Sequence, residues 1–415
     1  MGKLNFTQIS LNSQFESLNC FRNINDIFTD TLLVEILQRL TCIDVVRSKL
    51  VCRRWKSVIL ETYFAPTFIR YHDQLSTRFP MPVTLVYQFI FWHRVVTDEP
   101  ESRVVSFSDN PFFKTRKFNL GFLPCFRSWA RHPIWVTASN KDLLVCYDTK
   151  KSTQSSYYIC NPLTKHLVVV PPISGQTRVA DTAMGLVVSE TGMFRLVRIL
   201  ELDSDDRFEA EVFCSEKSEW TKTSITSPIS FRRSWHFKPE ATVINNKLHW
   251  LINSEIIVVL DPFDDKELLC RVINLPSEIN SQTAICIGSS RGCLKLSQLT
   301  GGYPNGNLVI WSFRDIVTKN WELECKISLR DVGFVDNLYF ENYVCHMVEV
   351  LGFHPCDSMI LYLRIRNYLV VCNLGCRTLE VASECLEDST FSLGTCGVFP
   401  LVHPSWPSSL VSSRS

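Results

Sequence analysis

The sequence predicts an α+β multidomain protein, with a small module of three helices followed by a large, mainly-β domain. Three observations predict it. Apolar residues recur at helical spacing between Leu32 and Ile59. From about Pro80 onward, short runs of β-branched, leucine and aromatic residues alternate with turn-forming residues, as strands do. The strand pattern then repeats about every 50 residues, which indicates one structural unit used several times.

The composition excludes several classes of protein. The chain has 415 residues, of which 46% are hydrophobic and 20% charged, as is typical of folded globular proteins. Its formal net charge of +1 gives no general attraction to nucleic acid or to an acidic membrane surface. The first residues lack the apolar core of a signal peptide, and no long apolar run predicts a membrane span. We therefore expect neither a nucleic-acid nor a membrane partner.

The 17 cysteines indicate a reducing compartment. Their number is odd and they form no C-x-x-C pair, whereas a secreted protein usually has an even, patterned set. Cys52, Cys160, Cys270 and Cys372 lie inside apolar runs, where a free cysteine behaves as a small hydrophobic residue. We expect an intracellular protein of the nucleus or the cytoplasm.

The helical module has clear start signals. Residues 29–31 are good N-cap candidates before the first apolar run, and Thr41 with Asp44 forms a start signal of the capping-box type. The third helical segment covers residues 51–59. Because about 40 residues seldom build a stable core alone, an apolar surface left on this module predicts a partner site. The alternative is a helical subdomain that packs on its own chain.

The β region contains a repeat. Stretches that begin at Asn140, Asn245, Arg291 and Asp357 share one order of strand, loop, strand, turn and strand. Six turn markers lie 52, 54, 46, 54 and 58 residues apart. They are Asp109, Asn161, Ser215, Asp261, Asp315 and Asn373. Such periods are typical of β-propeller blades and predict about six of them, whereas a pair of β-sandwiches, the alternative, need not repeat in register.

The helical segment IFTDTLLVEILQRLTCIDVVRSKLVCRRWKSVI, residues 27–59, resembles an F-box, the module that docks onto a Skp-type adaptor in cullin-RING ubiquitin ligases. The resemblance implies that the apolar face of the helices contacts the adaptor. The implied adaptor-binding residues are Ile27, Phe28, Leu32, Ile36, Leu37, Leu40, Val45, Leu50, Val51, Cys52 and Trp55. Some of them belong to the core of the module, and the sequence does not separate the two groups.

Two positions depart from the F-box pattern. The family usually has proline where this chain has Phe28, and often has proline where it has Thr41. Proline at the first helical position is already shaped for the helix. We therefore expect weakened or altered adaptor binding rather than its loss.

The β region resembles the F-box-associated, kelch-like region of plant F-box proteins, in stretches such as YYICNPLTKHLVVVPP and KLHWLINSEIIVVLDP. This resemblance implies a propeller that binds a target protein, and it does not name the target. The expected organisation is a flexible segment 1–25, an F-box 26–65, a linker with a possible ring-closing strand 66–105, a propeller 106–402 and a disordered tail 403–415.

One loop offers candidates for target binding. Arg232, Arg233, Trp235 and His236 combine the residue types that usually anchor protein interfaces, although an ordinary exposed loop is the alternative. The aromatic residues elsewhere, such as Trp220 and Trp321, are expected to pack between blades.

Motifs for catalysis and metal binding are weak. Residues 288–292 match G-x-S-x-G, but strands precede and follow them where a hydrolase needs a strand and a helix, so we expect a hairpin turn. The pairs 345–346 and 354–356 offer zinc-type ligands, yet neighbouring strand residues point to opposite faces. Residues 203–206 lack the glycine and distal glutamate of a calcium loop. We expect no catalytic residue, metal or cofactor.

These observations lead to a hypothesis of function. The chain is expected to be the non-catalytic substrate-recognition subunit of an SCF-type ubiquitin ligase. Its F-box would bind the Skp-type adaptor and, through it, the cullin and the RING protein, while the propeller would bind an unknown target protein. One alternative is an F-box-like binding module that acts outside a ligase. Another is an enzyme built on the propeller, because a fold alone does not exclude catalysis.

Overall fold

The computed structural model divides the chain into two compact units, residues 1–79 and residues 80–415, and each is described by itself. No described helix has the length and apolar character needed to cross a membrane. The structure describes residues 28–76, 83–92, 101–108, 120–124, 134–148, 157–172, 183–204, 206–231, 237–264, 270–279, 283–313, 320–335, 347–366, 368–384, 392–393, 397–404, 406–408 and 410. The expected flexible segment 1–25 lies outside these residues.

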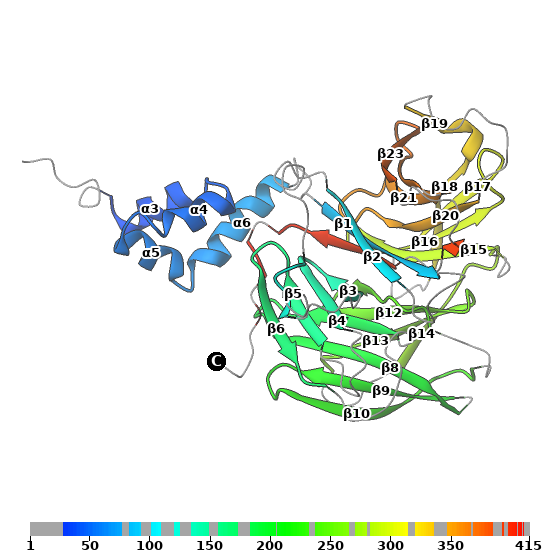
Figure 1. The fold of residues 1–415 in the computed structure, drawn as a ribbon, viewed down its shortest axis with the longest axis horizontal. Coiled ribbons are helices and arrows are strands. Elements are labelled where there is room, and N and C mark those ends of the chain that lie inside the picture. Colours follow the sequence, from blue (N-terminus) through cyan, green and yellow to red (C-terminus); the bar gives the residue numbers. More distant parts are fainter. Residues whose placement is uncertain are drawn as a thin grey trace, which may run out of the picture. The chain divides into compact units, whose positions relative to one another are not determined.

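The first unit is helical (Figure 1). Its described helices are α3 (Asp30–Leu37), α4 (Cys42–Ser48), α5 (Arg53–Leu60) and α6 (Phe64–Ser76). The first three each follow an extended residue whose side chain caps the helix. Thr29 Oγ1 accepts from the backbone N–H of Leu32, and Cys52 Sγ accepts from that of Trp55. These caps satisfy N–H groups that a helix start leaves without a partner.

Helix α6 occupies the first part of segment 66–105, which was expected to hold a linker and a possible ring-closing strand. Phe64 and Phe68 lie one helical turn apart and are fully buried, with their ring centroids 6.1 Å apart. Pro66 lies in the first turn of α6, where a helix tolerates proline because no N–H is needed there. The helical unit therefore extends through Ser76. Its remaining buried apolar side chains are Leu33, Val34, Leu37, Val45, Val58 and Ile59.

The second unit is a β-propeller whose described strands form six sheets (Figure 1). Five of the sheets consist of strands that follow one another along the chain. The first has β3 (Ile134–Asn140), β4 (Leu143–Asp148), β5 (Tyr157–Asn161) and β6 (His166–Val170). The second has β7 (Met184–Val188), β8 (Phe194–Ser204), β9 (Arg207–Cys214) and β10 (Glu219–Thr226).

The next three sheets follow the same plan. The third has β11 (Thr242–Ile244), β12 (Lys247–Ile252), β13 (Ile256–Leu260) and β14 (Cys270–Asn274). The fourth has β15 (Ala284–Ser290), β16 (Cys293–Thr300), β17 (Asn307–Phe313) and β18 (Trp321–Ser328). After the 3₁₀ helix η3 (Leu329–Asp331), the fifth has β20 (Val348–Phe353), β21 (Ile360–Ile365), β22 (Tyr368–Asn373) and β23 (Thr378–Glu384), with β19 (Gly333–Phe334) added in parallel to β23.

The sixth sheet joins the two ends of the propeller sequence. It pairs β1 (Val83–Trp92) with β2 (Glu101–Ser108), β24 (Ser392–Leu393) and β25 (Gly397–Val402). The long antiparallel register of β1 and β25 runs from Val83 opposite Val402 to Gln88 opposite Gly397. The inner strands contact one another in the closed order β25, β3, β7, β11, β15, β20 and β25. The expected count of about six blades thus corresponds to five sheets of consecutive strands and this closing sheet.

The predicted turn markers occupy one structural position. Asn161, Ser215, Asp261 and Asn373 each lie at the end of the third strand of a sheet. The Asn161 side-chain oxygen accepts from the backbone N–H groups of two following residues, and that of Asn373 accepts from one. Such side-chain bonds stabilise tight turns. Asp109 and Asp315 lie outside the described residues.

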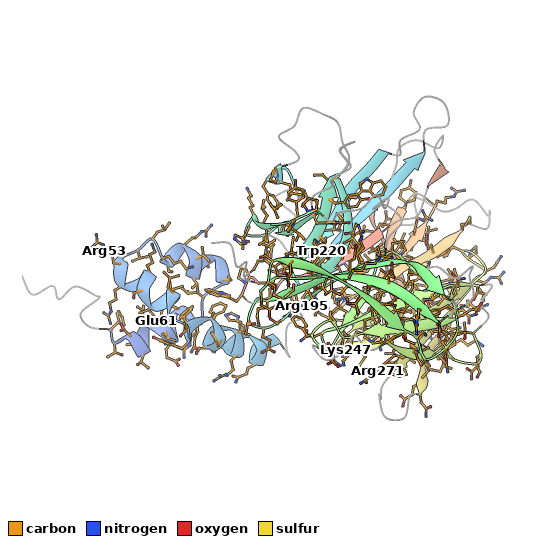
Figure 2. All side chains as sticks on the ribbon, turned by 90° about the horizontal axis from the view of Figure 1, so that it is seen from below. Arg53, Glu61, Arg195, Trp220, Lys247 and Arg271 are labelled. Carbon is orange, nitrogen blue, oxygen red and sulfur yellow. The ribbon has the colours of Figure 1, made fainter. Side chains whose placement is uncertain are left out.

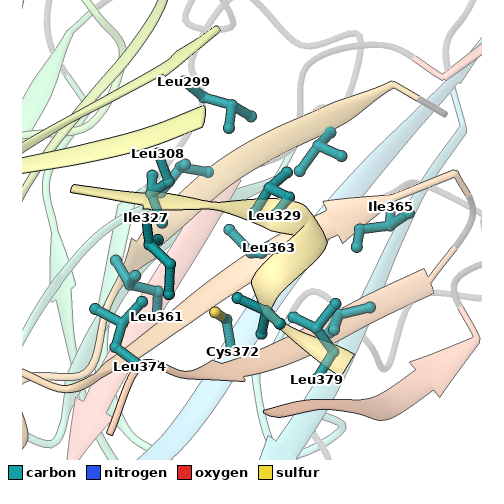
Figure 3. Close-up of a cluster of buried hydrophobic side chains, with 14 of the residues drawn as sticks. Leu299, Leu308, Ile327, Leu329, Leu361, Leu363, Ile365, Cys372, Leu374 and Leu379 are labelled. Carbon is teal, nitrogen blue, oxygen red and sulfur yellow. The ribbon is translucent and has the colours of Figure 1, made fainter. Parts of the chain in front are cut away.

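The apolar cores lie between neighbouring sheets. The cluster of Figure 3 combines Leu308 of the fourth sheet with Leu361, Leu363 and Leu379 of the fifth in one core. Tryptophans add hydrogen bonds between sheets. Trp220 Nε1 on β10 donates to the carbonyl of Pro171 after β6, at 2.9 Å. Trp321 Nε1 on β18 repeats this contact with the carbonyl at the end of β14, at 2.8 Å. The two outer strands are thereby tied to the preceding sheets.

The C-terminal tail, expected to be disordered from residue 403, packs on the first sheet where it is described. The Ser408 backbone N–H donates to Asp142 Oδ2 at 3.0 Å, and the same carboxylate oxygen accepts from Asn161 Nδ2 at 2.6 Å. Leu410 is buried in the core between the first and second sheets. One backbone donor and one apolar side chain thus hold the described part of this segment on the propeller.

Candidate functional site

The helical unit exposes a set of large apolar side chains at the end of α4. Val46 is 46% exposed, Leu50 is 87% exposed and Val51 is 60% exposed. We call these three residues the α4 apolar surface. Full burial of a valine or leucine side chain contributes about 1.5–3 kcal/mol. Covering these exposed side chains with another protein would therefore contribute a substantial binding free energy.

Local hydrogen bonds hold the α4 apolar surface outward. Val45 is fully buried, so its neighbour Val46 points away from the core. After α4 ends, the backbone N–H of Leu50 donates to the Arg47 carbonyl at 2.9 Å, and that of Val51 to the Ser48 carbonyl at 3.1 Å. These turns fix Leu50 and Val51 without burying them. The apolar side chains are therefore presented by an ordered backbone.

The structure sorts the predicted adaptor-binding residues into groups. Leu37 and Val45 are fully buried, so they belong to the part of the set that forms the core of the module. Leu32, Leu50 and Val51 are exposed. The half-buried residues are Phe28, Ile36, Leu40, Cys52 and Trp55, whereas Ile27 lies outside the described residues.

Val46 was missed by the sequence analysis. It lies four residues before Leu50, so the helical spacing that selected Leu50 could have selected Val46 too. Val45 was predicted instead, because two adjacent valines leave open which of them faces inward. Only the packing of α4 decides this.

Local hydrogen bonds hold the chain at the two positions that depart from the F-box pattern. Thr41 is the N-cap of α4, where Oγ1 accepts from the Asp44 N–H at 3.3 Å and donates to Asp44 Oδ2 at 2.7 Å. The carbonyl of Phe28 accepts from Arg54 Nη2, and the same guanidinium binds Asp30 Oδ1 at 2.8 Å. Arg54 thus fixes the chain before α3. Arg54 is the second residue of α5, and the two ends of α5 are marked by Arg53 and Glu61 in Figure 2.

The proposed target-binding residues Arg232, Arg233, Trp235 and His236 lie outside the described part of the chain. The G-x-S-x-G match forms the expected hairpin, because Ser290 pairs with Cys293 across the turn between β15 and β16. The hydroxyl of Ser290 is buried and donates to the His354 carbonyl at 2.7 Å. This serine therefore joins two sheets.

Of the candidate zinc ligands, the described histidine has a structural role. His354 Nδ1 accepts from the backbone N–H groups of Cys356 and Asp357, at 3.1 and 3.0 Å, so it shapes the turn after β20. Residues 345–346 lie outside the described residues. Within the described ranges, no group of three or more His, Cys, Asp or Glu side chains could hold a metal ion.

Buried thiols are held in their neutral form. Burial raises the pKa of Cys286 and of Cys372 to about 12, and that of Cys270 to about 11. A thiol reacts as a nucleophile through its thiolate, which a raised pKa disfavours. These cysteines therefore serve packing.

Two family models match the chain over most of its length. The F-box domain matches residues 27–65, and the β-propeller of the F-box protein At3g26010-like family matches residues 94–398. The first match contains α3–α5 with the α4 apolar surface. The second contains the five sheets of consecutive strands.

Three F-box proteins of Arabidopsis thaliana are similar to this chain over most of its length. F-box protein At5g49610 is 25% identical over 81% of this chain and 89% of its own, and F-box protein At1g49990 is 27% identical over 88% of both. F-box protein At3g26010 is 21% identical over 94% of this chain and 92% of its own. With an exposed apolar surface on an F-box and a closed ring of sheets behind it in sequence, the chain belongs to the At3g26010-like family of F-box proteins with a β-propeller.

Proposed function

We propose that this protein is the substrate-recognition subunit of an SCF-type ubiquitin ligase. The observation that carries the proposal is the α4 apolar surface, an ordered and exposed apolar set inside a matched F-box. F-box domains generally bind a Skp-type adaptor. Burial of Val46, Leu50 and Val51 against that adaptor would release the free energy that the isolated unit leaves unused.

The propeller would supply the second binding event. It holds a target protein, while the adaptor, cullin and RING protein bring a ubiquitin-conjugating enzyme to the same assembly. The contribution of the chain is proximity, because two binding sites on one chain raise the effective concentration of the target at the enzyme. The protein itself is non-catalytic in this proposal and acts in the nucleus or the cytoplasm.

Co-purification of the full chain with a Skp-type adaptor tests the proposal. The variant Leu50→Asp/Val51→Asp places two charges on the exposed surface and leaves the buried core intact. The matched control is Leu323→Asp/Val169→Asp, which makes the same two changes at exposed positions of the propeller, 60% and 51% exposed. We expect the wild type and the control to bind the adaptor, and the α4 variant to lose binding by about 100-fold or more.

Equal binding by the α4 variant and the wild type would contradict the proposed docking surface. Absence of a wild-type complex would contradict the ligase function. Adaptor binding without recruitment of the cullin would instead support the alternative of a module that acts outside a ligase. The capping of α4 by Thr41 favours intact docking, since it satisfies the helix start that proline usually shapes.

A further inference from the structure

The propeller contains a partly open cavity of about 750 Å³ between its inner strands. Its wall comes from inner strands of several sheets, which places residues far apart in the sequence around one space. This volume lies within the range of small-molecule sites, about 300–1,000 Å³. The apolar part of the wall includes Ala241, Ile285, Val350, Val398 and Phe399.

Charged side chains gather where inner strands begin. Lys238 and Glu240 precede β11, Cys286 lies near the start of β15, and Glu349 is the second residue of β20. Glu240 interacts electrostatically with Lys238 and Glu349, and the same three charges act on the Cys286 thiol. Three different sheets therefore bring these groups to one end of the cavity, which we call the Glu240 end.

Glu349 already has a partner in this group. It forms an ion pair with Arg364 on the neighbouring strand β21. Glu240 differs, because among the described residues its carboxyl hydrogen-bonds only to its own backbone N–H. Lys238 has an exposed side chain and acts on Glu240 through its charge alone. Glu240 is thus a cavity-facing carboxyl with acceptor capacity that no other described side chain uses.

The closing sheet leaves space for the Glu240 carboxyl. A Cβ atom added to Gly397, the first residue of β25, would lie 2.9 Å from Glu240 Oε1 and 2.8 Å from the ring of Phe399. Both distances are shorter than van der Waals contact. A glycine at this position therefore leaves room for the Glu240 carboxyl and the Phe399 ring, and both residues line the cavity.

The chemistry of this end indicates the ligand. A carboxylate in an enclosed space gains most from a cationic N–H donor, because charge-assisted hydrogen bonds are shorter and stronger than neutral ones. The apolar wall suits a hydrophobic body attached to that donor. We propose that the cavity of the propeller binds a small organic amine, with its ammonium group on Glu240 and its apolar part against the wall near Phe399.

This proposal stands apart from adaptor docking, because every residue in it belongs to the propeller. Glu240 is half-buried, and the electrostatic surroundings of its carboxyl agree with the proposal. Desolvation raises the pKa of this carboxyl, Lys238 lowers it and Glu349 raises it further. An ammonium ligand would provide the positive charge that favours the ionised form.

Calorimetric titration of the full chain tests the proposal with tryptamine as the probe. Tryptophol, which has a hydroxyl in place of the ammonium, is the matched neutral probe. We expect tryptamine to bind and tryptophol to bind at least about tenfold more weakly. Glu240→Gln keeps the size of the side chain and removes its charge, and we expect it to weaken tryptamine binding about tenfold or more.

Glu190→Gln provides the matched control, because Glu190 also lines the cavity but lies in the turn after β7, away from the Glu240 end. It should change tryptamine binding by less than about twofold. The melting temperature of each variant confirms that it is folded. Three results would each overturn the proposal: no tryptamine binding at millimolar concentration, equal binding of both probes, or unchanged binding by folded Glu240→Gln.

Discussion

The helical unit and the propeller place their apolar residues differently. In the propeller, apolar clusters fill the spaces between neighbouring sheets, and exposed apolar side chains such as Leu323 and Met359 are scattered over different sheets. In the helical unit, three exposed apolar residues fall within residues 46–51. Scattered exposed residues are normal on a protein surface, whereas a local group marks a contact site. The propeller thus completes its own core, and the helical unit keeps apolar surface for a partner.

Leu37→Asp should have the largest effect on stability, because it changes a core residue of the helical unit. Leu37 is fully buried, so the substitution both removes a core side chain and buries a charge. We expect the free energy of unfolding of this unit to fall by more than about 4 kcal/mol. Hydrogen exchange of the backbone amides in α3–α5 measures the loss.

Leu32→Asp is the matched control, since Leu32 lies on the same helix and is 45% exposed. It should leave the amide protection of α3–α5 nearly unchanged. Equal loss of protection in the two variants would contradict the assignment of Leu37 to the core and of Leu32 to the surface.

A buried ion pair allows a test of the propeller core. Arg198 on β8 binds Glu211 on β9 at 2.8 Å, and its Nη1 donates to the Tyr157 hydroxyl of the first sheet at 3.3 Å. Arg198→Met leaves the Glu211 carboxylate buried without its partner, so we expect unfolding to become easier by about 3–5 kcal/mol. Denaturant titration of the full chain, followed by tryptophan fluorescence, measures this change.

The double variant Arg198→Met/Glu211→Leu removes both charges. It should regain most of the lost stability, because replacing a whole buried pair with apolar residues is often close to neutral. A double variant as unstable as Arg198→Met would show that the pair itself, rather than the stranded charge, provides the stability.

A smaller effect follows from His249 on β12. Burial lowers its pKa from 6.5 to about 4, so the fold favours the neutral imidazole. Since the folded pKa is the lower one, this stability is fully present above about pH 6.5 and is lost as the pH falls toward 4. The loss amounts to about 3 kcal/mol. The free energy of unfolding should be measured for the wild type and for His249→Gln at several pH values between 7 and 4. We expect it to fall less steeply with decreasing pH in the variant, and equal slopes would contradict the role of His249.

The sequence predicted the repeating parts of the molecule well and the single contacts poorly. Strand alternation and turn residues such as Asn161 and Asn373 recur at a fixed spacing, so they predicted the sheets without knowledge of any contact. Helix α6 escaped prediction because Pro66 reads as a helix breaker until its place in the first turn is known. The packed tail escaped because its order depends on Asp142 and on one leucine, Leu410.

The candidate sites show the same limit. Helical spacing selected Leu50 and Leu37 alike, although one is exposed and the other buried, because periodicity defines a face and not the element that covers it. The Glu240 end of the cavity had no signal in the sequence. Its members come from three sheets, and only the closed order of the inner strands brings Glu240, Cys286 and Glu349 together.

The pairing of β1 with β25 has a consequence for the synthesis of the protein. Residues 83–88 leave the ribosome early, yet their partners, residues 397–402, emerge more than 300 residues later. This edge of β1 must therefore wait for its partner while more than 300 further residues are made, and exposed strand edges are prone to wrong pairing. A chain cut short before Gly397 would keep that edge open permanently, so a modest C-terminal deletion should make the protein a client of chaperones and proteases.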